Sequence, residues 1–120
     1  MRTVLIVDGY EDLTTSLAHE LSVHRWRVIY AHTVDEAKRV AEGIHIDVVL
    51  TDEVVQEGKG ILVEDAFRSA GQLKDTPFVY MVASASVTQT LQGKQLLPKP
   101  FTVAEALDRL ASATGRDRPV

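Results

Sequence analysis

Two short apolar runs that each stop at an aspartate restrict the folds open to this chain more than any other feature. The first run is Val4–Val7, followed by Asp8, and the second is Val48–Leu50 with Thr51, followed by Asp52. Neither run alternates apolar with polar side chains. A strand that is apolar on both sides is typical of a parallel sheet with helices on both faces. We therefore expect both runs to be central strands of such a sheet.

Helical and strand-like patterns alternate along the rest of the chain. Leu13, Leu17 and Leu21 recur at the spacing of one helix face, and two Ser/Thr-x-x-Glu capping boxes open further helices. The expected elements are, in chain order, a helix at 11–23, a strand at 27–31, a helix from the box Thr33–Glu36 to Gly43, a strand at 47–52, a helix at 61–70 closed by Gly71, strands at 78–83 and 96–97, and a helix from the box Thr102–Glu105 to Gly115. Pro98, after the last strand, fits only an edge strand or a strand end.

Strands that alternate with helices in this way build a five-stranded parallel sheet of the α/β class, with helices on both faces. The length of 120 residues suits one domain, 1–120, with residues 115–120 expected as a frayed tail. Residues 84–94 are a weak stretch, because Ser, Thr, Gln and Gly93 leave room for at most a short turn of helix. We therefore expect the fourth helix of the fold to be short or missing.

Charge and composition exclude several classes of function. The chain has 13 Lys and Arg against 17 Asp and Glu, and its basic residues form no stripe, so we expect no nucleic-acid contact. It has no cysteine, which excludes disulfides, thiolate metal cages and thiol nucleophiles and favours a reducing cytoplasm. No apolar run approaches the roughly 20 residues that cross a bilayer, so we expect no membrane segment.

The carboxyl ends of the expected strands bring reactive side chains to one edge of the sheet. Ligands of open α/β sheets bind outside this edge, where Asp8, Asp52 and Lys99 are expected to converge. A carboxylate at this place can attack a phosphoryl group if a divalent cation and an ammonium neutralise the phosphoryl oxygens. Because Mg²⁺ needs only one or two carboxylates besides water and a carbonyl, Asp8 and Asp52 are candidate ligands for it.

Three motifs, in this order, resemble the receiver domain of two-component response regulators: Val7-Asp8, Asp47–Asp52 and Lys99-Pro100-Phe101. The resemblance covers nearly the whole chain, and the Lys-Pro-Phe ending is specific when it follows two strands that end in aspartate. It implies a flavodoxin-like (βα)5 three-layer sandwich with the strand order 2-1-3-4-5. Val63–Phe67 and Thr76–Met81 further resemble small stand-alone bacterial receivers with a reduced fourth helix.

The resemblance also implies a role for each matching residue. Asp52 is expected to be the phosphoacceptor and Lys99 the lysine that senses the phosphate. Asp8 is expected to be one member of an acidic pair that binds Mg²⁺, together with Asp52 and the backbone carbonyl of Val54. The peptide bond between Lys99 and Pro100 is expected to be cis.

The sequence departs from the receiver pattern at three positions. Gly9 stands where receivers usually have a second acid that touches the metal, so we expect a weakened magnesium site. Counting from Pro77 places the hydroxyl that contacts the phosphoryl group at Val82, which cannot donate a hydrogen bond. Ser84, two residues further along, is the substitute that we expect, because strand alternation returns it to the same face. Leu96 occupies the position of the usual switching aromatic residue, so an aromatic switch is not expected.

Two functional hypotheses remain open. In the first, a histidine kinase or phosphotransfer protein phosphorylates Asp52, and the domain signals to a downstream protein by contact. Such a domain assists its own phosphorylation at most, and is expected to be a monomer or weak homodimer. In the second, Gly9 and Val82 mark a pseudo-receiver that keeps the fold and acts without phosphate. A small phosphatase fits less well, because no second acid lies two residues after Asp8.

Overall fold

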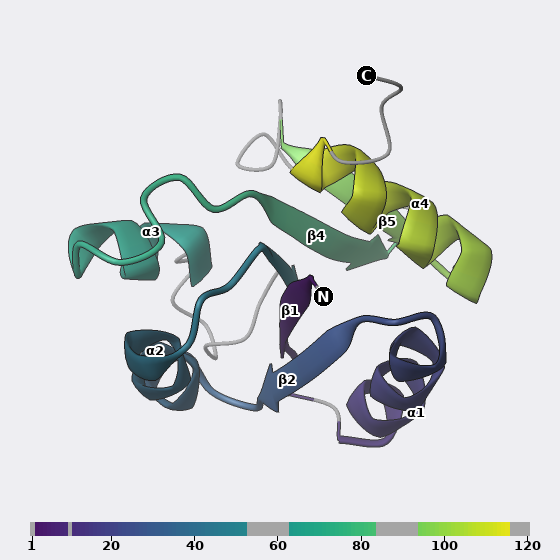
Figure 1. The fold of residues 1–120 in the computed structure, drawn as a ribbon, viewed down its shortest axis with the longest axis horizontal. Helices are drawn as coiled ribbons and strands as arrows, with labels where there is room; N and C mark the ends of the chain where they lie inside the picture. Colours follow the sequence, from purple (N-terminus) through teal and green to yellow (C-terminus); the bar gives the residue numbers. More distant parts are fainter. Residues whose placement is uncertain (1, 10, 53–62, 84–93, 116–120) are drawn as a thin grey trace.

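The computed structural model describes residues 2–9, 11–52, 63–83 and 94–115, in which strands and helices alternate (Figure 1). The strands are β1 (Thr3–Val7), β2 (Arg27–Ala31), β3 (Val48–Asp52), β4 (Phe78–Ala83) and β5 (Gln95–Lys99). The helices are α1 (Glu11–Val23), α2 (Val34–Gly43), α3 (Val63–Ser69) and α4 (Val103–Thr114). Within these residues, no helix combines the length and the apolar character that a membrane span requires.

The five strands are parallel and form one sheet with the order β2-β1-β3-β4-β5. Helices α2 and α3 cover one face, and α1 and α4 cover the other (Figure 1). This arrangement confirms the expected flavodoxin-like sandwich and its strand order. β1 and β3 lie inside the sheet, as their apolar sequences predict, and every residue of both strands is buried.

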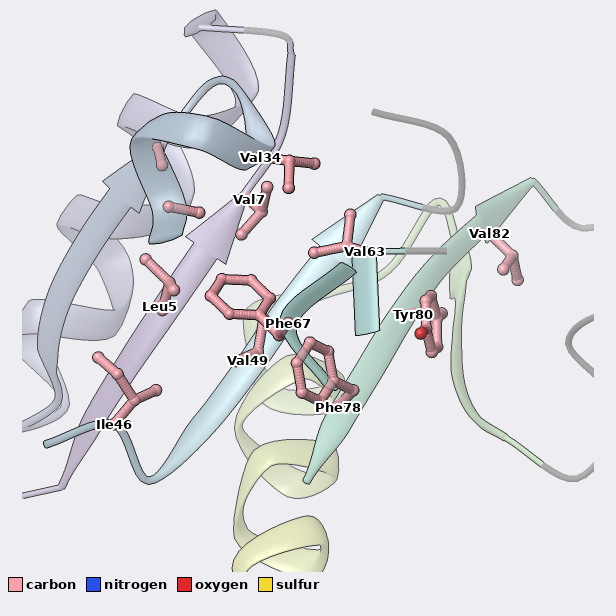
Figure 2. Close-up of a cluster of buried hydrophobic side chains, with 12 residues drawn as sticks. Leu5, Val7, Val34, Ile46, Val49, Val63, Phe67, Phe78, Tyr80 and Val82 are labelled. Atoms are coloured by element: carbon pink, nitrogen blue, oxygen red, sulfur yellow. The ribbon is translucent and has the colours of Figure 1, made fainter. Parts of the chain in front are cut away.

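Side-chain alternation along each strand divides the core into two clusters. In β1, Leu5 packs into the cluster beneath α2 and α3, whereas Ile6 packs into the cluster beneath α1 and α4. Figure 2 shows the first cluster, in which Phe67 of α3 lies against Phe78 of β4 with ring centroids 5.9 Å apart. Each face of the sheet therefore has a continuous apolar layer that fixes its helices.

The start and end of α4 confirm the predicted signals. The Thr102 hydroxyl accepts a hydrogen bond from the backbone N–H of Glu105, and the Glu105 carboxylate accepts one from the backbone N–H of Thr102. Gly115 ends the helix with φ +69°, and Gly71 follows α3 with φ +73°. Both glycines lie in the left-handed region, which a side chain disfavours.

The bounds of α2 confirm the prediction. Thr33 caps the start of the helix, since its hydroxyl accepts from the N–H of Glu36. Gly43 is the last helical residue, as expected, and Ile44 caps the helix in an extended conformation. A partly buried isoleucine packed against the core pulls the chain directly toward β3, so no left-handed turn is needed.

β5 lies at the edge of the sheet, where the sequence places a strand that contains proline. It is longer than the two residues predicted, because Gln95 and Lys99 also pair with β4. The prediction of a short or missing fourth helix concerns residues 84–94, nearly all of which lie outside the described part of the chain. Residues 116–120 of the predicted frayed tail also lie outside it.

A polar network connects α3 with β4 and with the residue before β5. The Glu64 carboxylate accepts hydrogen bonds from the Tyr80 hydroxyl at 3.0 Å, from Lys94 Nζ at 3.2 Å and from Arg68 Nη2 at 3.2 Å. Burial would raise the pKa of Glu64, but the hydrogen bonds from Lys94 and Tyr80, the charge of Lys94 and the hydrogen bond from Arg68 outweigh it and lower this pKa. Burial, followed by the charge of Glu64, raises the pKa of Tyr80 far above its ordinary value.

Replacing Phe67 with alanine should destabilise the domain strongly. The ring is fully buried, and its removal loses apolar burial and leaves a cavity, which costs about 3–5 kcal/mol for such a residue. Urea unfolding measures the difference. Val23→Ala is the control, because Val23 is 64% exposed and its truncation should change the free energy of unfolding by less than about 0.5 kcal/mol. Equal effects of the two substitutions would contradict the described core.

Replacing Glu64 with glutamine should destabilise the domain near neutral pH by about 1–2 kcal/mol, because charge-assisted hydrogen bonds are lost. The pKa of Glu64 is lower in the folded than in the unfolded chain, so its stabilising effect is complete above the ordinary value of 4.5 and is lost as the pH falls through the folded pKa. Urea unfolding from acid to neutral pH should therefore show wild type and Glu64→Gln converging in acid. Asp65→Asn, an equal charge change on the exposed side of α3, is the control. A difference that persists unchanged in acid would contradict the account.

Candidate functional site

Two buried aspartates lie side by side at the carboxyl edge of the sheet. β1 and β3 are neighbours, and Val7 pairs with Thr51, so Asp8 and Asp52 occupy adjacent positions directly beyond this pair. Asp8 is fully buried and Asp52 is 8% exposed. A buried carboxylate is stable only if a nearby cation or hydrogen-bond donor compensates its charge. We therefore expect cations or hydrogen-bond donors next to these two aspartates.

Lys99 provides one such cation. Its Nζ lies 3.0 Å from Asp52 Oδ1, in a salt bridge that connects β5 to β3 across the end of β4. Asp52 pairs with Met81 and Lys99 pairs with Ala83, so the lysine starts further along the edge and its side chain reaches back over the strand between them. The three predicted residues thus come together at one edge, with the ammonium in contact with the expected phosphoacceptor.

Backbone contacts position this edge. The Lys99–Pro100 peptide bond is cis, as expected. The carbonyl of Asp8 accepts a hydrogen bond from His32 Nδ1 at 3.0 Å, so this ring nitrogen carries the proton, and the Asp8 N–H donates to the carbonyl of Ala31. Sequence analysis missed His32. The signal that points to it is its place directly after β2, whose carboxyl end lies at the same edge.

Val82 is at the position where counting from Pro77 places the hydroxyl of the receiver pattern. Its side chain is fully buried in the cluster beneath α2 and α3 (Figure 2). Val82 pairs with Pro98 of β5, and the next residue, Ala83, pairs with Lys99. An apolar side chain therefore occupies this position, next to the strand that carries Lys99.

Three further positions of the predicted site are Ser84, Val54 and Gly9. Ser84 and the Val54 carbonyl lie outside the described residues, so their roles stay predictions. Gly9 is exposed, and a Cβ placed on it would meet no atom of the described residues within 4 Å. Packing against the described part of the chain therefore does not require glycine at this position.

The donor set suits a magnesium ion only in part. Two oxygen-bearing carboxylates, Asp8 and Asp52, are the kind of ligand that Mg²⁺ prefers, and the remaining positions can be filled by water and phosphate oxygens. Among the described residues, however, no group of three His, Cys, Asp or Glu side chains is arranged to hold a metal. Asp8 and Asp52 therefore suit Mg²⁺ by their chemistry. They offer one carboxylate fewer than a site that also has an acid at position 9.

Comparison with known sequences finds bacterial regulatory proteins that are similar to this chain. The transcriptional regulatory protein CpxR of Escherichia coli K12 is 29% identical over 121 residues, which cover 97% of this chain and 50% of CpxR. The response regulator MprA of Mycobacterium avium is also 29% identical, covering 97% of this chain and 52% of MprA. The chain thus spans about half the length of the curated relatives it matches. No protein-family model matches it.

Solved structures give the same result. The chemotaxis response regulator CheY4 of Vibrio cholerae is 26% identical, with a TM-score of 0.80 over 94% of this chain and 98% of that chain. The HemR receiver domain of Leptospira biflexa is 29% identical, with a TM-score of 0.77 over 100% and 99%. The receiver domain of the sensor histidine kinase PA1611 from Pseudomonas aeruginosa, 24% identical with a TM-score of 0.80 over 95% and 98%, has a magnesium ion in its active-site cleft.

These similarities agree with the strand order of the sheet, the two aspartates at its carboxyl edge and the lysine that contacts one of them. The chain has the fold of a receiver domain, and its sequence is similar to those of response regulators.

Proposed function

We propose that this receiver domain accepts a phosphoryl group on Asp52 from a histidine kinase or phosphotransfer protein and signals by protein–protein contact. The observation that carries the proposal is the 3.0 Å contact between Lys99 Nζ and Asp52 Oδ1, next to the buried Asp8. A carboxylate needs a fixed cation beside it when it becomes part of a charged acyl phosphate. The position of Lys99 meets that need before the reaction begins.

In the proposed reaction, an oxygen of the Asp52 carboxylate attacks the phosphorus of a phosphohistidine. The new O–P bond forms as the N–P bond breaks, and the imidazole leaves with the electron pair of that bond. Lys99 remains within reach of the new phosphoryl oxygens and balances part of their charge. The added charge and acceptor oxygens then change how the carboxyl edge of the sheet meets a downstream protein.

Asp8 and Asp52 would hold a magnesium ion at this edge, and the carbonyl of Val54 is proposed as a further ligand. The receiver domain of PA1611 has a magnesium ion in its active-site cleft, which supports the assignment. When bound, the ion neutralises phosphoryl oxygens in the transition state. Because Gly9 supplies no carboxylate, we propose that the ion binds more weakly here than at a site with two adjacent acids.

The second candidate function is a pseudo-receiver that acts without phosphate. Gly9 favours it, because it removes one potential metal ligand, and so does Val82, whose apolar side chain is in the core. Both candidates predict a binding module that works through protein contacts, as a monomer or weak homodimer and without nucleic acid. They differ in whether Asp52 reacts.

Incubation with acetyl phosphate and Mg²⁺ should add one phosphoryl group to the chain, measured by intact-mass spectrometry. Asp52→Asn should gain no mass, because the attacking carboxylate is gone while the size of the side chain is kept. Asp47→Asn is the matched control, since Asp47 is a carboxylate next to the opposite end of β3 and its loss should leave the mass gain intact. Absence of a mass gain in wild type would remove the first function and leave the pseudo-receiver.

Replacing Gly9 with aspartate should strengthen Mg²⁺ binding about tenfold, because it adds a third carboxylate next to two existing ones in space that is open. Amide NMR shifts of Asp8 and Asp52 during a Mg²⁺ titration measure the affinity. Gly9→Asn adds a side chain of the same shape without the charge and should bind like wild type. If the aspartate and asparagine variants bind Mg²⁺ equally, the ion does not bind at this edge.

A further inference from the structure

β5 is bracketed by two lysines that contact carboxylates on different elements. Lys99, its last residue, contacts Asp52 at the end of β3 at 3.0 Å. Lys94, directly before its first residue, contacts Glu64 of α3 at 3.2 Å. The Asp52 and Glu64 side chains are only 11% and 17% exposed, so both ion pairs are partly shielded from water. Each end of the strand is therefore tied to a separate part of the fold.

Within the sheet, β5 has a neighbour on one side. It is an edge strand whose five residues all pair with β4. Pro98, next to Lys99, has no N–H to donate to the ladder, and Leu97 is the only residue of the strand that is fully buried. The placement of Lys99 along the edge of the sheet therefore depends on the pairing with β4 and on the contact at the other end of the strand.

Glu64 is well suited to fix that end. Its carboxylate also accepts hydrogen bonds from the Tyr80 hydroxyl and from Arg68. These two bonds fix the position of the carboxylate independently of Lys94. Tyr80 of β4 is fully buried and pairs with Leu96 of β5, so the network contacts the neighbour of the strand that carries Lys99. A carboxylate with three donors from three parts of the chain is a rigid anchor for an edge strand.

We propose that Glu64 is a positioning residue for the Asp52 site, because it holds Lys94, thereby fixes β5, and so keeps the Lys99 ammonium against Asp52. The consequence for reactivity rests on the proposed phosphorylation of Asp52. The positional effect does not, since both ion pairs exist in the unmodified chain. By the reciprocity of coupled sites, a change at Asp52 also alters the Lys94–Glu64 pair.

The first test uses NMR of the full unphosphorylated chain and follows the ¹³C shift of the Asp52 carboxyl group. Lys99→Met defines the full effect of losing the ion pair. Glu64→Gln and Lys94→Met should each produce about one third or more of that change, as expected for coupled positions. Asp65→Asn makes the same charge change on the exposed side of α3 and should produce less than about one tenth of the change.

The second test measures the rate at which acetyl phosphate and Mg²⁺ phosphorylate the same variants. Glu64→Gln and Lys94→Met should slow the reaction about threefold to tenfold, and Asp65→Asn should leave it unchanged.

If wild type is not phosphorylated at all, the proposed function fails and the NMR test alone decides the positioning role. If Glu64→Gln unfolds the domain, Lys94→Met decides it, because Lys94 is 34% exposed and outside the core. An Asp52 shift in folded Lys94→Met equal to that in Asp65→Asn would overturn the proposal.

Discussion

The salt bridge between Lys99 and Asp52 depends on the whole architecture, because its partners are 47 residues apart in sequence. They meet only because β3, β4 and β5 run parallel and end at the same edge of the sheet. A mostly buried carboxylate is costly unless a cation or donors compensate its charge, so the fold and the ion pair support each other. The same dependence makes the site sensitive to small shifts of the edge strand that carries the lysine.

The charge balance at this edge separates the chain from a receiver with two adjacent acids. With Gly9 in place of the second acid, this edge has one carboxylate fewer, so its excess of negative charge is smaller. The ion pair between Lys99 and Asp52 balances a larger share of that charge, and a divalent cation is less strongly attracted. This balance is the physical reason why both phosphorylation with weak metal binding and signalling without phosphate are consistent with the sequence.

Much of the fold could be predicted because its signals are local. The apolar run Val4–Val7, the capping box at Thr102 and the proline of β5 each report on a few neighbouring residues, and the structure agrees with all three. The role of Ser84, which lies outside the described residues, stays a prediction. Glu64 and Lys94 were missed because their contact joins two elements 30 residues apart, and no pattern in the chain signals it.

The reaction of Asp52 next to Lys99 can be followed by transfer of phosphate from a phosphohistidine-bearing phosphotransfer protein. Borohydride reduction and peptide mapping by mass spectrometry then locate the phosphorylated residue. Borohydride converts an aspartyl phosphate to homoserine, so the reacted position is marked permanently. We expect homoserine at position 52 in wild type and none in Lys99→Met at the same reaction time. Homoserine at another aspartate, or equal conversion in both proteins, would contradict it.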